Sequence, residues 1–222
     1  MVLIKNKESN IRKTFIWGGK SQLRILLPYL ESINRFPDYV FDPYLKNLEF
    51  EIKGTHFSKE EQISQYASEC DSFVVAIGGN HGKKRHQISK FLKNKFKLKP
   101  LLMMHHNSYI CETSKYGDGL MMMPGSIVNS YSSIGDQCII NTNASIDHES
   151  ILGNGVHIMG SAVITGRVTI GDFVTVGSNA TILPDLKIGD NSIIGAGAVV
   201  TKDVPSCTTV VGIPARKFNK KI

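Results

Sequence analysis

The sequence predicts a chain of two parts, an N-terminal α/β domain with a small parallel sheet and a C-terminal parallel β-helix. Residues 13–107 alternate apolar, strand-like runs with segments of helical spacing, which is typical of a parallel α/β domain. From Met122 to Val200, an aliphatic residue or methionine instead recurs at every sixth position without insertion or deletion. We therefore expect one domain over residues 1–108, with residues 1–12 flexible, and a second over residues 109–222.

The N-terminal half contains strand signals, helix signals and a final apolar stretch. Strands are predicted at 13–19, 39–42 and 71–80, helices at 21–33, 58–68 and 82–96, and the apolar stretch covers 100–104. The first and last strands both end in Gly-Gly. Gly-rich turns at the carboxyl edge of a parallel sheet suit a phosphate ligand, because helix N-termini point there. Ordinary βα turns are an equally good explanation of the same glycines.

These turns exclude two common nucleotide-binding motifs. The run from Gly18 to Ser21 imitates the end of a Walker A loop, but Thr14 stands where that motif needs its first glycine. No complete GxGxxG is present, which disfavours a bound dinucleotide. Asp42 follows the second strand, where an acid that reads a ribose or base often lies. A simple strand-end cap is the alternative for Asp42.

The second half repeats with a period of six. The repeated positions are Met122, Val128, Ile134, Ile140, Ile146, Leu152, Ile158, Ile164, Ile170, Val176, Ile182, Ile188, Ile194 and Val200. Neither an α-helix nor a single strand demands this period, whereas a prism of short parallel strands does. Three hexapeptides close one coil, so residues 18 apart lie over one another. A glycine often follows the aliphatic residue, and we expect it to allow close turns and positive φ.

Charge and cysteine usage restrict the partners and the compartment. The formal net charge is +7, which favours anionic partners, and basic residues cluster at 83–99 and in the C-terminal tail. No nucleic-acid motif accompanies them, so a phosphate-rich small molecule or a solvated helix face explains them as well. The four cysteines have no framework spacing, and no secretory leader or bilayer-spanning run is visible. We expect a cytoplasmic protein that binds neither nucleic acid nor a membrane.

The repeat resembles that of the left-handed parallel β-helix acyltransferases, and Gly195–Phe218 resembles the closing motif of that superfamily. A small Rossmann-like domain followed by an uninterrupted hexapeptide helix is similar to the bacterial nucleotide-sugar N-acetyltransferases and the related sialic acid O-acetyltransferases. The similarity is strongest over Asn141–Gly166. It implies a left-handed coil, a homotrimer with active sites between subunits, and acetyl-CoA as donor. It further implies a 4-amino-4,6-dideoxy sugar, carried by a nucleotide on the N-terminal domain, as acceptor.

Acetyl transfer to an amine needs a base, an oxyanion donor and aligned substrates. Histidine suits the first role because its pKa lies near neutrality. The resemblance assigns His148 as the general base and Glu149 as the carboxylate that orients it, with Asp147 a less favoured partner. The resemblance also names Gly166 as an oxyanion donor, and its 18-residue separation from His148 agrees, because it places the two on adjacent coils. A surface histidine without a role is the alternative for His148.

The remaining candidate residues bind the two substrates. By resemblance, His157 contacts acetyl-CoA near its carbonyl and Asn141 lies near the active site, while Lys202 and Arg216 suit the CoA phosphates. A plain surface position is the alternative for His157. For the nucleotide sugar we expect contacts from the two Gly-rich turns and the second strand end, namely Gly18, Gly19, Lys20, Asp42, Gly79 and Asn80. The turn Trp17–Gln22 departs from the GGH-type loop of the relatives, which leaves UDP, dTDP and GDP open.

Three other functions compete with sugar N-acetylation. An O-acetyltransferase on sialic acid or a similar free sugar would share the base and donor but lack nucleotide binding. A zinc hydratase of the carbonic anhydrase type needs three histidine ligands, whereas only His148 and His157 fall within the repeats, so no metal is expected. A non-catalytic nucleotide-sugar-binding scaffold would lose no activity on replacement of His148.

Overall fold

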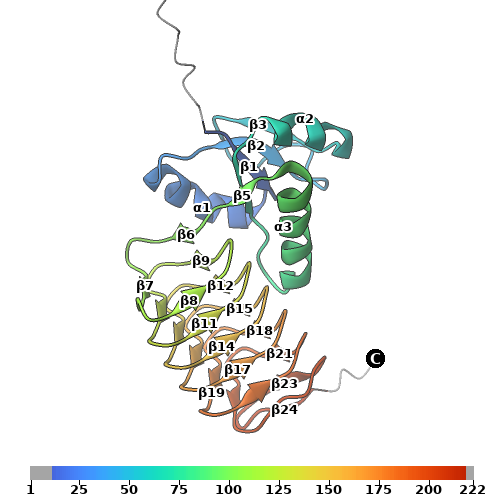
Figure 1. Ribbon diagram of the computed structural model, residues 1–222. Coiled ribbons are helices and arrows are strands. Elements are labelled where there is room, and N and C mark those ends of the chain that lie inside the picture. Colours follow the sequence, from blue (N-terminus) through green and yellow to red (C-terminus); the bar gives the residue numbers. More distant parts are fainter. Residues whose placement is uncertain (1–11, 219–222) are drawn as a thin grey trace, which may run out of the picture.

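The computed structural model describes residues 12–218 and shows an α/β domain standing on the first coils of a β-helix (Figure 1). The expected flexible lead-in at 1–12 lies outside the described residues except for its last member. The α/β domain has a five-stranded sheet of order β3-β2-β1-β4-β5, in which every pairing is parallel. Its strands are β1 (Thr14–Trp17), β2 (Pro37–Phe41), β3 (Thr55–Phe57), β4 (Ser72–Val75) and β5 (Lys99–Pro100). The predicted α/β class is therefore confirmed.

Helices cover the two faces of this sheet. They are α1 (Ser21–Ser32), α2 (Ile63–Ser68), which follows the 3-10 turn η1 (Glu60–Gln62), and α3 (Gly82–Phe96). Because side chains alternate along a strand, Phe15 packs with α2 and α3, whereas its neighbour Ile16 packs with α1. The predicted helices match these segments closely. Strand β3 was not predicted, since three residues are too few for a periodic signal.

The β-helix has three flat faces made of short strands that pair in parallel, except for the last strand, β24, which pairs antiparallel with β23. The first face contains β6 (Met103–Met104), β9 (Met121–Met122), β12 (Ile139–Ile140), β15 (His157–Ile158), β18 (Thr175–Val176), β21 (Ile193–Ile194), β23 (Thr209–Val211) and β24 (Arg216–Lys217). The second contains β7 (Tyr109–Ile110), β10 (Ile127–Val128), β13 (Ser145–Ile146), β16 (Val163–Ile164), β19 (Thr181–Ile182) and β22 (Val199–Val200). The third contains β8 (Lys115–Tyr116), β11 (Ser133–Ile134), β14 (Ile151–Leu152), β17 (Thr169–Ile170) and β20 (Lys187–Ile188). The predicted hexapeptide coil is confirmed.

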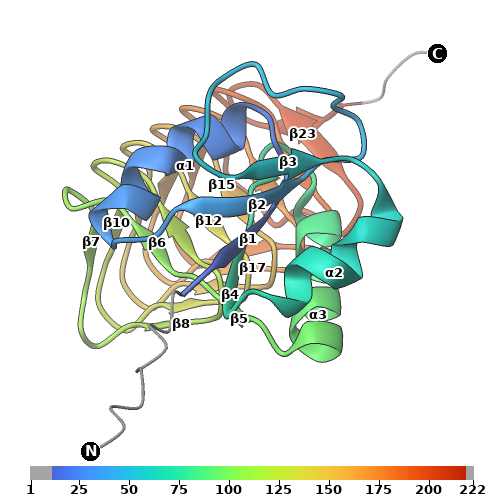
Figure 2. The same cartoon turned by 90° about the horizontal axis from the view of Figure 1, so that it is seen from above.

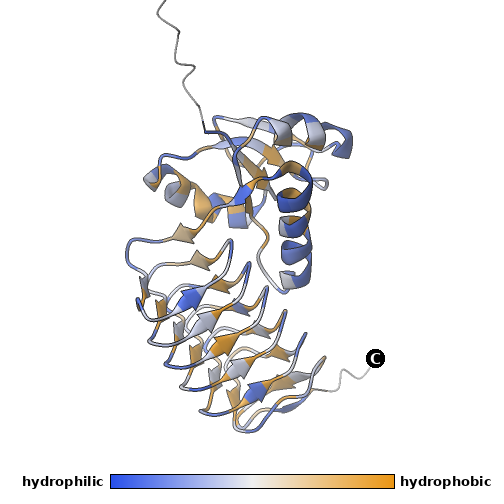
Figure 3. Cartoon of the chain, viewed as in Figure 1, coloured by the Kyte–Doolittle hydropathy of each residue, from blue (hydrophilic) through white to orange (hydrophobic). Residues whose placement is uncertain are grey.

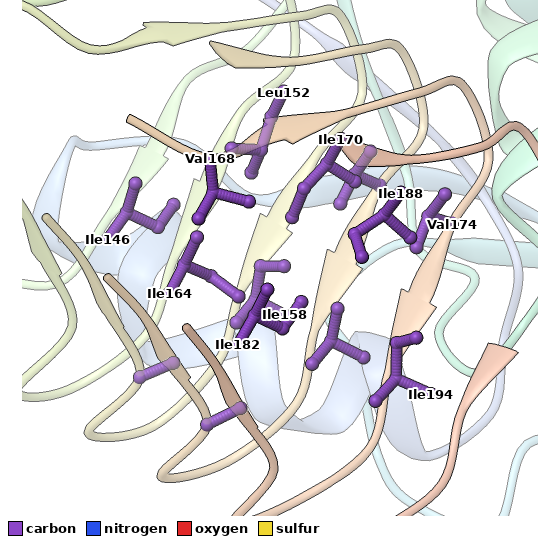
Figure 4. Close-up of a cluster of buried hydrophobic side chains, with 14 of the residues drawn as sticks. Ile146, Leu152, Ile158, Ile164, Val168, Ile170, Val174, Ile182, Ile188 and Ile194 are labelled. Carbon is purple, nitrogen blue, oxygen red and sulfur yellow. The ribbon is translucent and has the colours of Figure 1, made fainter. Parts of the chain in front are cut away.

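The repeated aliphatic residue is the second residue of each strand and points into the coil, as Figure 4 shows for Ile146, Ile164 and Ile182. These side chains form one continuous apolar core, and Figure 3 shows apolar residues in many strands of the coils, beside polar ones that point outward. The register begins three hexapeptides earlier than the sequence indicates. Met104, Ile110 and Tyr116 occupy the inward phase, but Tyr116 is exposed and breaks the aliphatic pattern.

The corners correct one expectation about glycine. Every sixth residue from Gly119 to Gly197 has a φ between 56° and 68°, and most of these residues are not glycine. The glycine that follows the aliphatic residue does not have positive φ in the repeats. It is needed because adjacent coils approach closely there: a Cβ at Gly135 would lie 2.6 Å from the carbonyl carbon of Gly153. The left-handed corner lies two residues further along and is held by the pairing of the strands on either side.

One corner column carries a ladder of acidic and amide side chains. Its members are 18 residues apart and lie between the third and first faces, namely Asp118, Asp136, Asn154, Asp172 and Asp190. In each step the side-chain Oδ1 accepts the backbone N–H of the equivalent residue one coil earlier, at 2.7–3.0 Å. The ladder satisfies corner N–H groups that the short strands leave unpaired.

The two domains share one apolar cluster. Met103, Met121 and Ile139, which point outward from the first face, pack with Leu23 and Leu26 of α1. Seen from above, the sheet and α1 cover the first coils and α3 stands beside them (Figure 2). The first face of the early coils is thus a covered surface, and the loops of the α/β domain are brought against the β-helix.

Candidate active site

His148 lies at the corner between the second and third faces, where its side chain is 40% exposed. Its Nδ1 is 2.9 Å from Oε2 of Glu149. Glu149 is the left-handed corner residue, with a φ of 58°. Asp147 instead accepts the backbone N–H of His148 through Oδ1 at 2.7 Å. Of the two neighbouring carboxylates, Glu149 contacts the ring and Asp147 holds the backbone.

Gly166 lies one coil further on, beside the opposite edge of the imidazole. A Cβ at position 166 would lie 2.5 Å from Nε2 of His148, so only glycine leaves the ring in its place. Within residues 12–218 the N–H of Gly166 meets no hydrogen-bond acceptor. The sequence therefore brings together a histidine, an orienting carboxylate and a free backbone donor at one exposed corner.

Charged residues continue this corner on the following coils. Arg167 and Asp185 follow Glu149 at intervals of 18 residues and form a two-pronged ion pair, with N–O distances of 2.6 Å and 2.9 Å. The Arg167 guanidinium lowers the pKa of the Asp185 carboxyl, and His148 contributes in the same direction. Neither Arg167 nor Asp185 was singled out from the sequence. Their 18-residue spacing from Glu149 was the available signal.

His157 is buried between the α/β domain and the β-helix. It is 4% exposed, its Nδ1 is 2.9 Å from the carbonyl oxygen of Gly79, and its Nε2 is 3.2 Å from Nδ2 of Asn141. Burial lowers its pKa to about 4, so the ring is neutral at physiological pH. The carbonyl requires a donor, so Nδ1 carries the proton and Nε2 accepts from Asn141. Both nitrogens thus have partners within the chain, and the expected contact with acetyl-CoA stays a prediction.

The carboxyl edge of the α/β sheet opens into a cavity of about 620 Å³. Its lining includes four of the expected contacts, Gly18, Lys20, Asp42 and Gly79, but not Gly19 or Asn80. The lining residues that were not predicted include Trp17, Tyr44, Glu60, His81 and Lys84. Lys84 belongs to the basic run 83–99, for which the sequence allows two interpretations, a ligand site and a solvated helix face.

Asp42 is buried and both of its carboxylate oxygens accept backbone N–H groups. Oδ2 accepts from Gly19 at 2.9 Å, and Oδ1 accepts from Tyr44 at 2.9 Å. The side chain therefore joins the first Gly-rich turn to the loop after β2, as the strand-end alternative predicts. Its position in the cavity lining leaves both roles compatible with the geometry.

A second cavity of about 400 Å³ lies at the C-terminal end of the β-helix and is lined by both Lys202 and Arg216. Lys202 belongs to the column of His148, because 148, 166, 184 and 202 are 18 apart and their strands stay in register. Three coil spacings of about 4.8 Å separate the two residues, or roughly 14 Å along the column. His148 and the cavity lined by Lys202 and Arg216 thus lie on one edge of the β-helix.

Residues 12–218 contain no group of three or more His, Cys, Asp and Glu side chains arranged to hold a metal ion. In the same residues, no helix has both the length and the apolar composition needed to cross a bilayer.

Comparisons with known proteins define the class of fold. The family model described as bacterial transferase hexapeptide (six repeats) matches residues 149–184 and 167–202. A search of curated protein sequences finds no significant match. Solved structures match over nearly the whole chain, so both the α/β domain and the β-helix have counterparts in the same relatives.

Three of these structures indicate which hexapeptide proteins share this architecture. A mutant of perosamine N-acetyltransferase from Caulobacter crescentus, in complex with CoA and GDP-perosamine, is 22% identical with a TM-score of 0.86, covering 95% of this chain and 98% of its own. The acetyltransferase domain of PglB from Neisseria gonorrhoeae, bound to acetyl coenzyme A, is 22% identical with a TM-score of 0.84, covering 93% and 99%. WeeI from Acinetobacter baumannii is 23% identical with a TM-score of 0.80, covering 93% and 100%. The chain has the fold of these proteins.

Proposed function

We propose that this protein is an acetyltransferase that moves an acetyl group from acetyl-CoA to the 4-amino group of a nucleotide-linked 4-amino-4,6-dideoxy sugar. The observation that carries the proposal is the arrangement at the exposed corner. There His148 has Glu149 against Nδ1, and Gly166, whose N–H meets no acceptor within residues 12–218, lies beside Nε2. The fold supports it, because the perosamine N-acetyltransferase of the same architecture is bound to CoA and GDP-perosamine.

Each group has one part in the reaction. Nε2 of His148 takes a proton from the sugar amine as its nitrogen attacks the thioester carbonyl, and Glu149 holds the ring through Nδ1. The carbonyl oxygen gains negative charge in the tetrahedral intermediate and accepts the N–H of Gly166. The carbon–sulfur bond then breaks, and the CoA thiolate takes the proton from His148. The products are the acetamido sugar and free CoA.

The 620 Å³ cavity is proposed to hold the nucleotide of the acceptor. Helix α1 begins at its edge with no acidic residue in the first turn, and Lys20 and Lys84 line the wall. The N–H groups of Lys20, Ser21 and Gln22 have no acceptor within the described chain. A helix N-terminus with free donors and two ammonium groups suits a diphosphate. Gly18, Gly19 and Asp42 shape this turn, and Gly78 and Gly79 line the opposite wall, directly before Asn80.

We propose that CoA lies along the edge of the β-helix between His148 and the C-terminal cavity. Lys202 and Arg216 line that cavity and would contact its phosphates. Asn141 is half-buried and retains a second Nδ2 hydrogen for the pantetheine arm. Because acetyl-CoA is a cytoplasmic metabolite and all four cysteines are free thiols, we place the reaction in the cytoplasm.

The geometry supports a homotrimer with sites between subunits. The acceptor cavity stands over the first face of the β-helix, because Gly79 in its wall contacts His157 of β15. His148 lies at the corner opposite that face, so a second subunit has to bring its corner to the cavity. The second face exposes Tyr109, Ile127 and Val163, an apolar surface that such an assembly would cover. Light scattering coupled to size-exclusion chromatography should give three times the mass of the chain.

The test of the reaction is acetyl-CoA-dependent thiol release with UDP-, dTDP- and GDP-linked 4-amino-4,6-dideoxy sugars, run beside His148→Ala. We expect turnover with one nucleotide and a loss of about 10²- to 10⁴-fold in the variant, whose CoA affinity should be unchanged. If His148→Ala keeps the turnover rate of the wild type, His148 is not the general base. If the wild type releases no thiol with any nucleotide sugar but does so with a free sugar that offers only hydroxyl groups, the reaction is O-acetylation and not N-acetylation.

A further inference from the structure

The cavity wall opposite α1 is held from behind by two buried side chains. This wall is the loop between β4 and α3, and its carbonyl groups turn toward the β-helix. Nη1 of Arg85 donates to the carbonyl oxygen of Ile77 at 3.0 Å, and Nδ1 of His157 donates to that of Gly79 at 2.9 Å. Both carbonyls belong to residues that line the cavity. The loop is therefore fixed at two alternate peptide groups.

Arg85 also fixes the β-helix. It is fully buried, and Nε donates to the carbonyl oxygen of Gln137 at 2.7 Å while Nη2 donates to that of Gly155 at 3.1 Å. No carboxylate contacts the guanidinium within residues 12–218, so all of its recorded partners are backbone carbonyls. Helix α3 starts in backbone contact with the same corner, because a Cβ at Gly82 would lie 2.0 Å from the oxygen of Gly155. The loop, α3 and two coils thus form one unit.

We call the contacts of Arg85 and His157 with the Ile77 and Gly79 carbonyls the clamp. Peptide geometry shows what the clamp does to the cavity wall. In a trans peptide the C=O and the following N–H point in opposite directions. With the Ile77 and Gly79 carbonyls turned toward the β-helix, the N–H groups of Gly78 and Asn80 point away from it. The cavity lies on that side, because its lining comes from residues 17–88 and includes none of the β-helix. Neither N–H has an acceptor within the described chain, and Gly79 between them has a φ of 62°.

We propose that Arg85 and His157 are positioning residues for the acceptor: they hold the Ile77 and Gly79 carbonyls so that the N–H groups of Gly78 and Asn80 face the cavity as donors to the phosphates of a nucleoside diphosphate. Successive free N–H groups around a left-handed glycine form an anion-binding concavity. Facing the free N–H groups at the start of α1, they give the diphosphate donors on two walls. This inference rests on the proposed function, and it assigns His157 to the acceptor, in place of the CoA contact implied by resemblance.

The test uses His157, because loss of the buried Arg85 would leave three carbonyls without donors and could unfold the domain interface. His157→Leu removes both hydrogen bonds and keeps the apolar volume. His157→Asn returns a donor near the position of Nδ1. His86→Leu is the matched control, since His86 is another buried histidine, packs against Phe173 and makes no hydrogen bond to the loop within residues 12–218. Isothermal titration gives the affinities for CoA and for whichever of UDP, dTDP and GDP the wild type binds best.

We expect His157→Leu to weaken nucleotide binding by about tenfold or more, with CoA affinity within about twofold of the wild type. His157→Asn should recover most of the loss, and His86→Leu should show none. Weaker CoA binding with unchanged nucleotide binding would overturn the proposal and restore the CoA contact. Equal loss in His86→Leu would also overturn it, because the effect would then be general.

Amide hydrogen exchange of the peptide over residues 76–82 tests the clamp without a ligand. Exchange should speed up in His157→Leu and stay at the wild-type rate in His86→Leu. Unchanged exchange in His157→Leu would overturn the clamp. A different outcome is that exchange is faster in His157→Leu, while the wild type binds CoA but no nucleotide. That result would support the clamp but contradict both the proposed acceptor and the role of the loop as a phosphate donor.

Discussion

Gly166 and His148 are complementary in shape across adjacent coils: a Cβ at position 166 would lie 2.5 Å from Nε2 and 2.8 Å from Cε1 of the imidazole. Real Cβ atoms essentially never come within 3.0 Å of a heavy atom outside their own and the adjacent residues. The glycine therefore has two consequences for the site. It leaves the ring room to lie against the coil, and it leaves its own N–H open to an approaching substrate.

Gly166→Ala should accordingly lower kcat by about 10²-fold or more, because the methyl group displaces the imidazole from its position and a misplaced base loses that much. The affinity for CoA and the melting temperature should change little. Gly160→Ala is the matched control, since Gly160 also follows an inward isoleucine by two residues and its Cβ would meet only the Thr142 oxygen at 3.5 Å. Steady-state kinetics of both variants decide the matter, and equal rates would contradict the steric relationship.

Glu149→Gln should lower kcat on the order of tenfold with little change in either KM. The amide keeps the size of the side chain, but it loses the charge that stabilises the protonated ring during proton transfer. Asp147→Asn is the control, because Asp147 uses Oδ1 to accept the His148 N–H, which an amide oxygen also does. If Asp147→Asn were the more damaging change, the carboxylate acting on the imidazole would be Asp147.

Much of the β-helix could be predicted because its register is local. Once the inward position is fixed at Ile146, each further inward residue follows by adding six. The meeting of His148 and Gly166 then follows by adding 18, without knowledge of any other contact. The sequence does not predict the first coil of the β-helix, because the exposed Tyr116 interrupts the aliphatic pattern near the start of the β-helix.

The contacts between the domains could not be predicted in the same way. Arg85 stands in a basic run that looks solvated, and its partners are carbonyls, which leave no trace in the sequence. The resemblance assigns His157 to acetyl-CoA, with a plain surface position as the alternative, although the outward positions before it, Met121 and Ile139, are apolar. Apolar outward residues do not by themselves mark the covered face, since Ile127 and Ile151 hold equivalent positions on the other two faces and are exposed.

Acidification should lower the stability of the fold through His157. Burial depresses its pKa from an ordinary 6.5 to about 4, whereas the unfolded chain keeps the ordinary value. Between pH 6.5 and 4 the unfolded state binds more protons, so stability falls as the pH falls, by about 3 kcal/mol in all from this group. Denaturant unfolding across this window measures the slope. His157→Leu should reduce the slope of the free energy of unfolding against pH by the equivalent of up to one bound proton. An unchanged slope would contradict a buried, neutral His157 ring.

The acidic ladder makes a separate prediction about stability. Asp172 accepts the backbone N–H of Asn154 at 2.7 Å and its Nδ2 at 3.1 Å, and its own N–H is accepted by Asp190 at 2.8 Å. Asp172→Ala should destabilise the protein by about 1–3 kcal/mol, because the Asn154 N–H loses its acceptor at a tight corner. Asp172→Asn keeps the Oδ1 acceptor and removes a like charge between Asp136 and Asp190. The midpoint temperature of thermal unfolding of this variant should therefore stay close to that of the wild type.

Thermal unfolding of the two variants separates the hydrogen bond from the charge. A ladder that acts through its hydrogen bonds gives a loss in Asp172→Ala alone. Equal losses in both variants would mean that the carboxylate charge, and not the acceptor, stabilises the corner. The basic helix α3 would then be the source of the attraction, since Lys93 forms an ion pair with Asp118 of the same ladder. High salt would in that case abolish the difference from the wild type, because it screens exposed charges and leaves hydrogen bonds in place.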